Sequence, residues 1–188
     1  MFMHRNRGRD AQAVSLGLLA AALISTAVTA ADKPDAFVLV AYSNRAGGTQ
    51  ISNGEYLTAT RETPASLPGD PGALATNHCV AFAMSAQLPQ AQLACDSAVQ
   101  AASREQAQLP SWNPHSRGQA ANSQAVAYSN RAVLRWLNAD AQGARQDLAC
   151  AQALAPQATF VIRNVNAMQS HENTAPARTA GLAKAAQE

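Results

Sequence analysis

The chain has 188 residues, of which 47% are hydrophobic and only 5% aromatic, and its formal charge is +2. This length suits one domain, and a composition rich in Ala with few β-branched runs favours helices over strands. The charge is too small for binding of nucleic acid or anionic lipid, which needs clustered Lys and Arg.

The first 30 residues predict a secretory signal peptide. Three arginines precede residue 10, and an apolar run over residues 13–30 follows and ends in Val28-Thr29-Ala30, a small-x-small cleavage pattern. Polar residues interrupt the run, so it is shorter than the ~20 apolar residues of a membrane span, which favours cleavage over a retained anchor. We therefore expect cleavage after Ala30, a periplasmic or secreted protein, and no membrane span once the leader is removed.

Removal of residues 1–30 also removes the excess charge. The leader carries three arginines against Asp10, so the rest of the chain is formally neutral. Only Lys33 and Lys184 are lysines. Neutrality argues again against nucleic acid as a partner.

Residues 31–53 predict an extended or disordered arm. Ala36–Tyr42 is a strand-like run, and Gly47-Gly48 follows it. A helical protein offers this run no sheet, so we expect it to lie extended across the helices or to be disordered. At the other end of the chain, residues 170–188 are polar and Ala-rich without apolar periodicity, which predicts a flexible tail.

Two segments of the chain align with each other without a gap. Residues 77–98 match residues 130–151: Asn77 pairs with Asn130, and small residues recur at matching places afterwards. Small residues at these spacings let two antiparallel helices pack closely. The matched small residues are Cys79 with Ala132, Ala86 with Ala139, Ala91 with Ala144, and Ala98 with Ala151.

This pattern resembles the tetratricopeptide repeat. The closing proline of the second copy is Pro156, and Asn164 lies 34 residues after Asn130, which is one repeat length. The resemblance implies an all-α domain of antiparallel helix-turn-helix repeats over residues 54–169, ending in a capping helix. Its parts are copies near 72–101 and 125–158, an insertion near 104–123 that departs from the family pattern, and the capping helix at 159–169.

Cys79 and Cys95 are a disulfide candidate. They lie at similar distances from the predicted turn near Ala86, so they face each other in an antiparallel helix pair, and an exported protein meets an oxidising compartment. The alternative is two buried thiols that act as small hydrophobic residues. In this pairing Cys150 is the cysteine outside the disulfide, and we expect it to be buried. No Cys-x-x-Cys motif and no His at ligand spacing indicate a metal site.

Arg131 and Asp147 also face each other across the turn of the second copy. A bidentate ion pair between them would determine the register of that helix pair. We expect this pair to be structural.

Partner binding is implied by the resemblance. In such arrays the first helix of each copy lines a concave groove that holds an extended peptide or a helix. We expect Trp136 to be the anchor, because an exposed Trp gives a large contact area; the alternative is that Trp136 packs under the insertion or under the chain's own arm. The expected groove residues are Val80, Met84, Val133, Trp136, Leu137 and Arg163.

The chain carries no pattern of an enzyme. Its four histidines are scattered, and it has no Gly-rich phosphate loop, nucleophile elbow or carboxylate pair. We expect a non-catalytic module without a cofactor that binds a protein or peptide partner. The alternative is a structural or self-associating envelope protein whose groove is filled by its own chain.

Overall fold

In a computed structural model of the protein, the described residues are 36–62, 71–110 and 112–185, with side chains described as far as residue 173. The chain divides into two units, Met1–Ala31 and Asp32–Glu188, and all described residues belong to the second. The predicted signal peptide and its cleavage point lie outside them.

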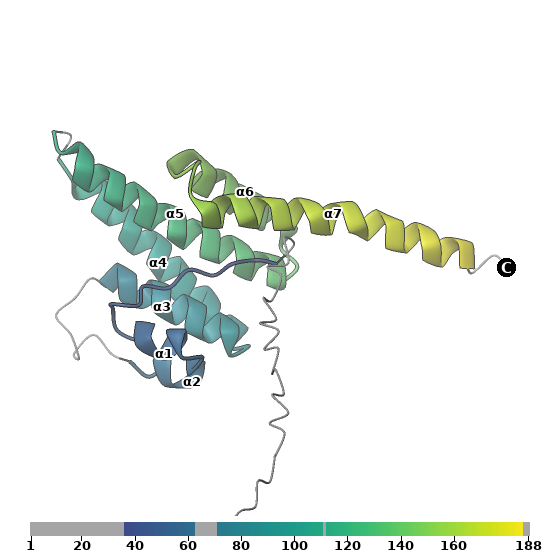
Figure 1. Cartoon of the computed structure of the whole chain (residues 1–188), viewed down its shortest axis with the longest axis horizontal. Coiled ribbons are helices and arrows are strands. Elements are labelled where there is room, and N and C mark those ends of the chain that lie inside the picture. The colour runs from purple at the N-terminus through teal and green to yellow at the C-terminus, as the bar shows by residue number, and fades with distance from the viewer. Residues whose placement is uncertain (1–35, 63–70, 111, 186–188) are drawn as a thin grey trace, which may run out of the picture. The chain divides into compact units, whose positions relative to one another are not determined.

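The described residues form seven helices and no strand (Figure 1). The prediction of an all-α protein is thereby confirmed for this part of the chain. The helices are α1 (Gly48–Ser52), α2 (Tyr56–Ala59), α3 (Pro71–Met84), α4 (Leu88–Gln108), α5 (Pro114–Leu137), α6 (Ala141–Leu154) and α7 (Thr159–Ala185).

Helices that are adjacent in sequence pack as antiparallel pairs. α3 packs against α4 and α5 against α6, while α4 also packs against α5, and α7 lies against both α5 and α6. The pairing follows from short connections, which leave two consecutive helices no room to lie apart.

Both helix pairs turn at an alanine with left-handed backbone. Ala86 has φ 58° and Ala139 has φ 62°. In each turn the amide of the next residue donates across the turn, from Gln87 to the Phe82 carbonyl at 2.9 Å and from Asp140 to the Arg135 carbonyl at 2.8 Å. Glycine is the usual residue in such a helix end, and alanine adopts the conformation at some cost in free energy.

Small side chains make up much of the core between the helices. Ala91 and Ala144 are fully buried, and Ala98 and Ala151 are at most 1% exposed. Because the alanine side chain is small, the helix axes can approach closely, and the side chains between the helices are packed at high density.

The region expected to be an insertion, residues 104–123, is mostly helical. α4 continues to Gln108 and α5 begins at Pro114, where Asn113 caps it by accepting from the Ser116 amide at 3.1 Å. The extra residues therefore lengthen two packed helices, and only a short link separates them. Proline at the first helical position fits because its missing N–H has no partner there in any case.

The C-terminal helix is longer than the sequence indicates. A capping helix over 159–169 and a flexible tail after it are expected, but α7 continues to Ala185. The alanines of this segment favour continuation of a helix that packing has already started, whereas Pro176 in its interior has no N–H to donate and disfavours it.

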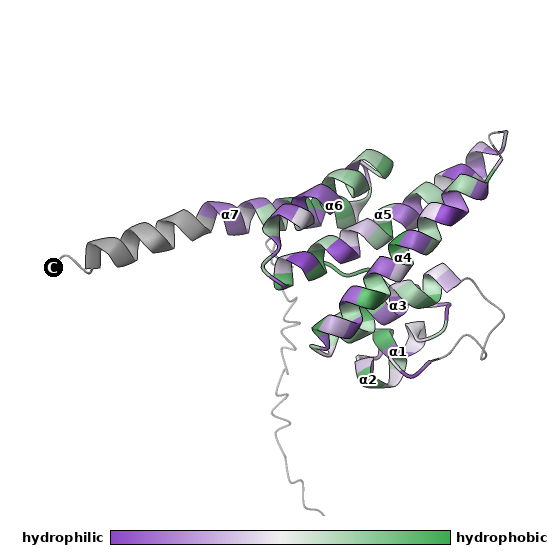
Figure 2. Cartoon of the chain, turned by 180° about the vertical axis from the view of Figure 1, so that it is seen from behind, coloured by the Kyte–Doolittle hydropathy of each residue, from purple (hydrophilic) through white to green (hydrophobic). Residues whose placement is uncertain are grey.

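Hydrophobic and hydrophilic residues are mixed along every coloured helix in Figure 2. In the part of the chain described here, no helix combines the length and the apolar character that crossing a membrane requires.

Candidate functional site

An extended segment crosses the first helix of each pair. Residues 36–42, which we call the arm, have neither helical nor strand hydrogen bonding among themselves. The arm runs from beside α7 across α5 to α3, opposite to the order of these helices in the chain (Figure 1). It corresponds to the strand-like run expected to lie across the helices.

Three asparagines bind the main chain of the arm, and each binds both polar groups of one arm residue. Asn164 accepts from the Val38 amide at 2.7 Å and donates to its carbonyl at 2.8 Å. Asn130 does the same for Val40 at 2.9 and 2.8 Å. Asn77 does so for Tyr42 at 2.7 and 3.0 Å.

The geometry follows from the chemistry of the carboxamide. An asparagine side chain offers an acceptor and a donor side by side, which complements the N–H and C=O of one residue in an extended chain. All three asparagines are fully buried, so without the arm their polar atoms would lack these partners. Because only main-chain atoms are bound, the contacts at these positions do not depend on the arm's side chains.

Two arm residues, Phe37 and Leu39, present their side chains to the helices. Phe37 packs against a cluster that includes Leu148 and Met168. Its ring lies 5.8 Å from the ring of Trp136 and is stacked on His171 at 5.4 Å, measured between centroids. These distances are typical of attractive aromatic pairs.

Leu39 packs against a second cluster, in which Cys79, Cys95 and Leu134 are buried with two alanines. Phe37 and Leu39 are two positions apart, so their side chains leave the extended chain on the same face. We call the surface that holds the arm the arm site; it consists of Asn77, Asn130, Asn164, Trp136, His171 and the two apolar clusters under Phe37 and Leu39.

The end of the arm nearest α1 is held by a tight turn. Asn77 donates a further hydrogen bond to the Ala46 carbonyl at 2.8 Å. Gly47 has φ 77°, and a Cβ at Gly48 would collide with the Tyr42 carbonyl. Glycine is therefore required where the arm turns into α1.

A further hydrogen bond supports the Asn164 side chain. Its amide nitrogen donates to the Ser129 hydroxyl at 2.8 Å, and both side chains are buried. This bond holds the carboxamide in the orientation that the Val38 main chain needs.

The predicted disulfide between Cys79 and Cys95 is present and links α3 to α4, with 4.7 Å between the Cα atoms. Cys150 is exposed, so the expectation that it is buried was wrong. Its neighbour Ala149 is also exposed, whereas Ala144 and Ala151 of the same helix are buried.

Arg131 forms the predicted ion pair with Asp147, through two hydrogen bonds of 2.8 Å. It also binds Asp96 on α4 at 2.9 Å and lies over the ring of Tyr128. Asp147 is 4% exposed and also contacts Arg135 at 3.2 Å. The two carboxylates raise the pKa of Arg131 despite its burial, and the network joins α4, α5 and α6.

The residues expected to contact a partner do not share one open surface. Val80 and Val133 are buried, at 2% and 3% exposure, in the core between the helices. Met84 and Leu137, at the ends of α3 and α5, are about half exposed. Trp136 and Arg163 are half-buried.

For Trp136 the structure has the alternative arrangement, in which it packs with the chain's own arm through Phe37. The Trp that faces solvent is instead Trp112, at 79% exposure between α4 and α5.

The repeat pattern placed the three asparagines at recurring positions but did not indicate their contacts with the arm. One signal was present: residues 40–46 and 126–132 are the same seven amino acids, Val-Ala-Tyr-Ser-Asn-Arg-Ala. The first copy includes the end of the arm, and the second lies in α5 and contains Asn130.

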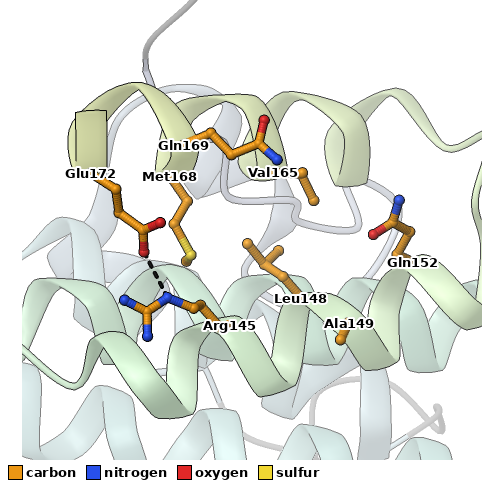
Figure 3. A pocket seen from close by; sticks show the side chains of 8 residues that line it. All are labelled: Arg145, Leu148, Ala149, Gln152, Val165, Met168, Gln169 and Glu172. Carbon is orange, nitrogen blue, oxygen red and sulfur yellow. Dashed lines mark hydrogen bonds and ion pairs between the residues drawn. The ribbon is translucent and has the colours of Figure 1, made fainter. Parts of the chain in front are cut away.

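A cavity between α6 and α7 is shown in Figure 3. It holds about 190 Å³ and is lined by Leu148, Val165 and Met168, with the Arg145–Glu172 ion pair (2.7 Å) across one end. Small-molecule sites usually measure about 300–1,000 Å³, so this cavity is small for a substrate. Within the described residues, no three His, Cys, Asp or Glu side chains are grouped to hold a metal ion.

Comparison with family models, with curated proteins and with solved structures found no match. The arm site is therefore interpreted from its own geometry.

Proposed function

We propose that this protein is a non-catalytic peptide-binding module, built as a short tetratricopeptide-like array, that holds an extended polypeptide segment by its main chain. The observation that carries the proposal is the set of three buried asparagines, each bonded to the N–H and C=O of one residue in the arm. Main-chain binding of this kind suits a site that receives a segment of polypeptide.

The repeat assignment is supported by positions that match in the two helix pairs. Ala86 and Ala139 share the left-handed turn conformation, and Asn77 and Asn130 share the same type of contact with the arm. Asn164 continues the series on α7. Close contacts between small residues, as at Ala91 and Ala144, agree with this assignment.

Two features of the chain favour an extracytoplasmic location. The Cys79–Cys95 disulfide suggests an oxidising compartment, and the basic and apolar pattern of residues 1–30 predicts export. The partner would then be another exported or envelope protein.

A second candidate function is structural, and a specific observation favours it. The arm of the same chain occupies the site, with Phe37 and Leu39 packed on the helices. In this alternative the arm is a permanent part of the fold, as the last strand is in many small domains, and the site never opens.

The two candidates differ in whether the arm can be replaced. We would measure binding of a fluorescent peptide with the sequence of residues 35–42 to the chain from Ala31 onward. The test variant is Leu39→Asp, which places a charge on an apolar cluster and so releases the arm without changing the site that receives the peptide. Asn44→Asp is the matched control, because Asn44 is exposed beyond the arm.

A peptide-binding module predicts that Leu39→Asp binds the peptide at least about 10-fold more tightly than the control, because the arm no longer competes. A permanently filled structural site predicts that Leu39→Asp loses its cooperative unfolding transition and binds no peptide. That second result would refute the peptide-binding proposal.

A further inference from the structure

Resting on the proposed function, we infer that the arm site selects segments of a partner protein in which an aromatic residue is followed two positions later by leucine. The segment would bind extended and in the direction of the arm, with its aromatic residue nearer α7 and its C-terminal end over α3. The arm is then an internal segment that competes with the partner for the same contacts.

The alternation of main-chain and side-chain contacts along the arm leads to this motif. Val38, Val40 and Tyr42 are held through main-chain atoms by Asn164, Asn130 and Asn77. Phe37, just before Val38, and Leu39, between Val38 and Val40, instead supply side chains to the two apolar clusters. Alternation of this kind is a property of any extended chain, so a partner bound by the same asparagines would present its side chains with the same spacing.

The position under Phe37 is suited to an aromatic ring. Trp136 and His171 lie 6.0 Å apart between ring centroids, and Phe37 contacts both at 5.8 and 5.4 Å. Aromatic pairs at such distances strengthen binding roughly 2- to 10-fold beyond the area they bury. An aliphatic residue here would fill part of the space without these ring contacts.

The position under Leu39 is lined by small and medium apolar residues. Ala83 and Ala91 lie beside the Cys79–Cys95 disulfide and Leu134 in this cluster. A leucine fits among them, while a larger ring would overfill the space and a charged residue would be buried without a partner.

The direction of the segment follows from the same two positions. The ring position lies with Trp136 and His171, and the leucine position with Cys79 and Leu134. A segment of reversed sequence would place leucine against the rings and the aromatic residue against the smaller cluster.

The observations favour a partner protein over a second copy of this chain. The turn at Gly47 and Gly48 joins the arm directly to α1, which Asn77 supports through the Tyr42 and Ala46 carbonyls, and this short connection keeps the arm next to its own site. An arm from a second copy would make the same contacts, lose this local attachment and pay the entropy of association. Only a segment with contacts of its own outside the motif gains by displacing the arm.

The test uses the Leu39→Asp chain, whose arm no longer competes, and five peptides based on residues 35–42. The parent peptide is compared with peptides in which Ala replaces the Phe, Ala replaces the Leu, Thr replaces both Val38 and Val40, or the order is reversed. Fluorescence anisotropy gives each dissociation constant. We expect the two Ala peptides and the reversed peptide to bind at least 10-fold more weakly than the parent, and the Thr peptide to bind within about threefold of it.

The same panel run on Leu39→Asp combined with Trp136→Ala tests the ring position. The ratio between the parent and the Phe-to-Ala peptide should fall to about one, while the ratio between the parent and the Leu-to-Ala peptide should be kept. A ratio for Phe that does not change would exclude Trp136 as the selecting residue.

Three results would overturn the inference, and they can be told apart. If all five peptides bind equally, the site binds peptide and the proposed function stands, but the motif is wrong. If none binds, the proposed function fails with it. If the wild-type chain is a dimer by light scattering and Leu39→Asp makes it a monomer, the occupant is a second copy and the assignment to a partner protein is wrong.

Discussion

Asn130 binds both main-chain polar groups of Val40, a residue 90 positions earlier in the chain. Both residues belong to copies of one seven-residue sequence. In the first copy the main chain of Val40 is available to be bound, and in the second the side chain of Asn130 does the binding. The same short sequence thus contributes to both sides of one contact.

Replacing Asn130 by Ala should loosen the arm. The Val40 amide and carbonyl lose their partners, and a hydrogen bond of this kind contributes about 1–3 kcal/mol when its loss leaves a buried group unsatisfied. We expect hydrogen exchange of the Val40 amide to become roughly 5- to 100-fold faster. Asn122→Ala, an exposed position on the same helix, is the control. Equal acceleration in the arm and in α5 would indicate global unfolding instead and would contradict the local effect.

The Cys79–Cys95 disulfide should stabilise the fold by restricting the unfolded chain. It joins residues 16 positions apart, and closing a loop of about this size contributes roughly 3 kcal/mol. The double variant Cys79→Ala/Cys95→Ala should therefore melt about 6–12 °C lower. Cys150→Ala should melt within about 1 °C of the wild-type chain, because that thiol is exposed and lies outside the core. A double variant with unchanged Tm would mean that the unfolded chain is already restricted in another way.

Asp147→Ala should be among the most destabilising changes in the second helix pair. It leaves Arg131 and Arg135 close together without the carboxylate between them, and breaking a buried pair of this kind costs about 3 kcal/mol or more. Glu172→Ala is the comparison, because Arg145 is 56% exposed and such surface pairs contribute less than about 1 kcal/mol. Urea unfolding of both variants measures the difference, and similar losses in the two would refute the ranking.

His78 should make the protein less stable at mildly acidic pH. Burial lowers its pKa from the ordinary 6.5, opposed by the nearby Glu62. The folded chain therefore takes up this proton less readily than the unfolded chain, and stability that is complete above pH 6.5 is lost as the pH falls below 6.5 toward the lowered pKa. His78→Phe keeps a ring beside Phe82 and should lose less stability between pH 7.5 and 5.5 than the wild type. An equal loss of stability in both chains over this pH range would contradict the assignment to His78.

Ala139→Gly should stabilise the turn between α5 and α6. Ala139 has φ 62°, where an L residue with a side chain loses about 1 kcal/mol relative to glycine. We expect Tm to rise by about 2–4 °C. The control, Gln146→Gly on the exposed side of α6, should lower Tm by a similar amount because glycine disfavours the helix interior. A lower Tm for Ala139→Gly would mean that the Ala side chain makes contacts that outweigh the strain.

Several features followed from local patterns alone. Periodicity and composition predicted helices, and the distances of Cys79 and Cys95 from a common turn predicted that they face each other. The same reasoning predicted the Arg131–Asp147 pair. These features depend on residues within one helix pair, where a short turn leaves little freedom.

Features that depend on longer distances were missed or misplaced. The helical continuation of α4 and α5 through the expected insertion, and of α7 to Ala185, depends on packing and on helices already begun. The hydrogen bonds of the arm site join residues up to 126 positions apart. No local pattern shows that a buried asparagine is bound to a distant main chain.

The repeated heptapeptide shows most clearly which features the sequence determined by itself and which the tertiary contacts determined. By itself, the sequence determined a helical, Ala-rich chain whose asparagines recur in register. It did not determine the conformation of Val-Ala-Tyr-Ser-Asn-Arg-Ala, which is helical at 126–132 and is extended and then turned at 40–46. In α5 the segment is buried between neighbouring helices, with helical residues on both sides. In the arm, Gly47 and Gly48 turn the chain, and asparagines from other helices replace the hydrogen bonds of a helix. Tertiary contacts decided between the two conformations, because the free energies that separate local conformations are smaller than those of burial and of satisfied buried hydrogen bonds.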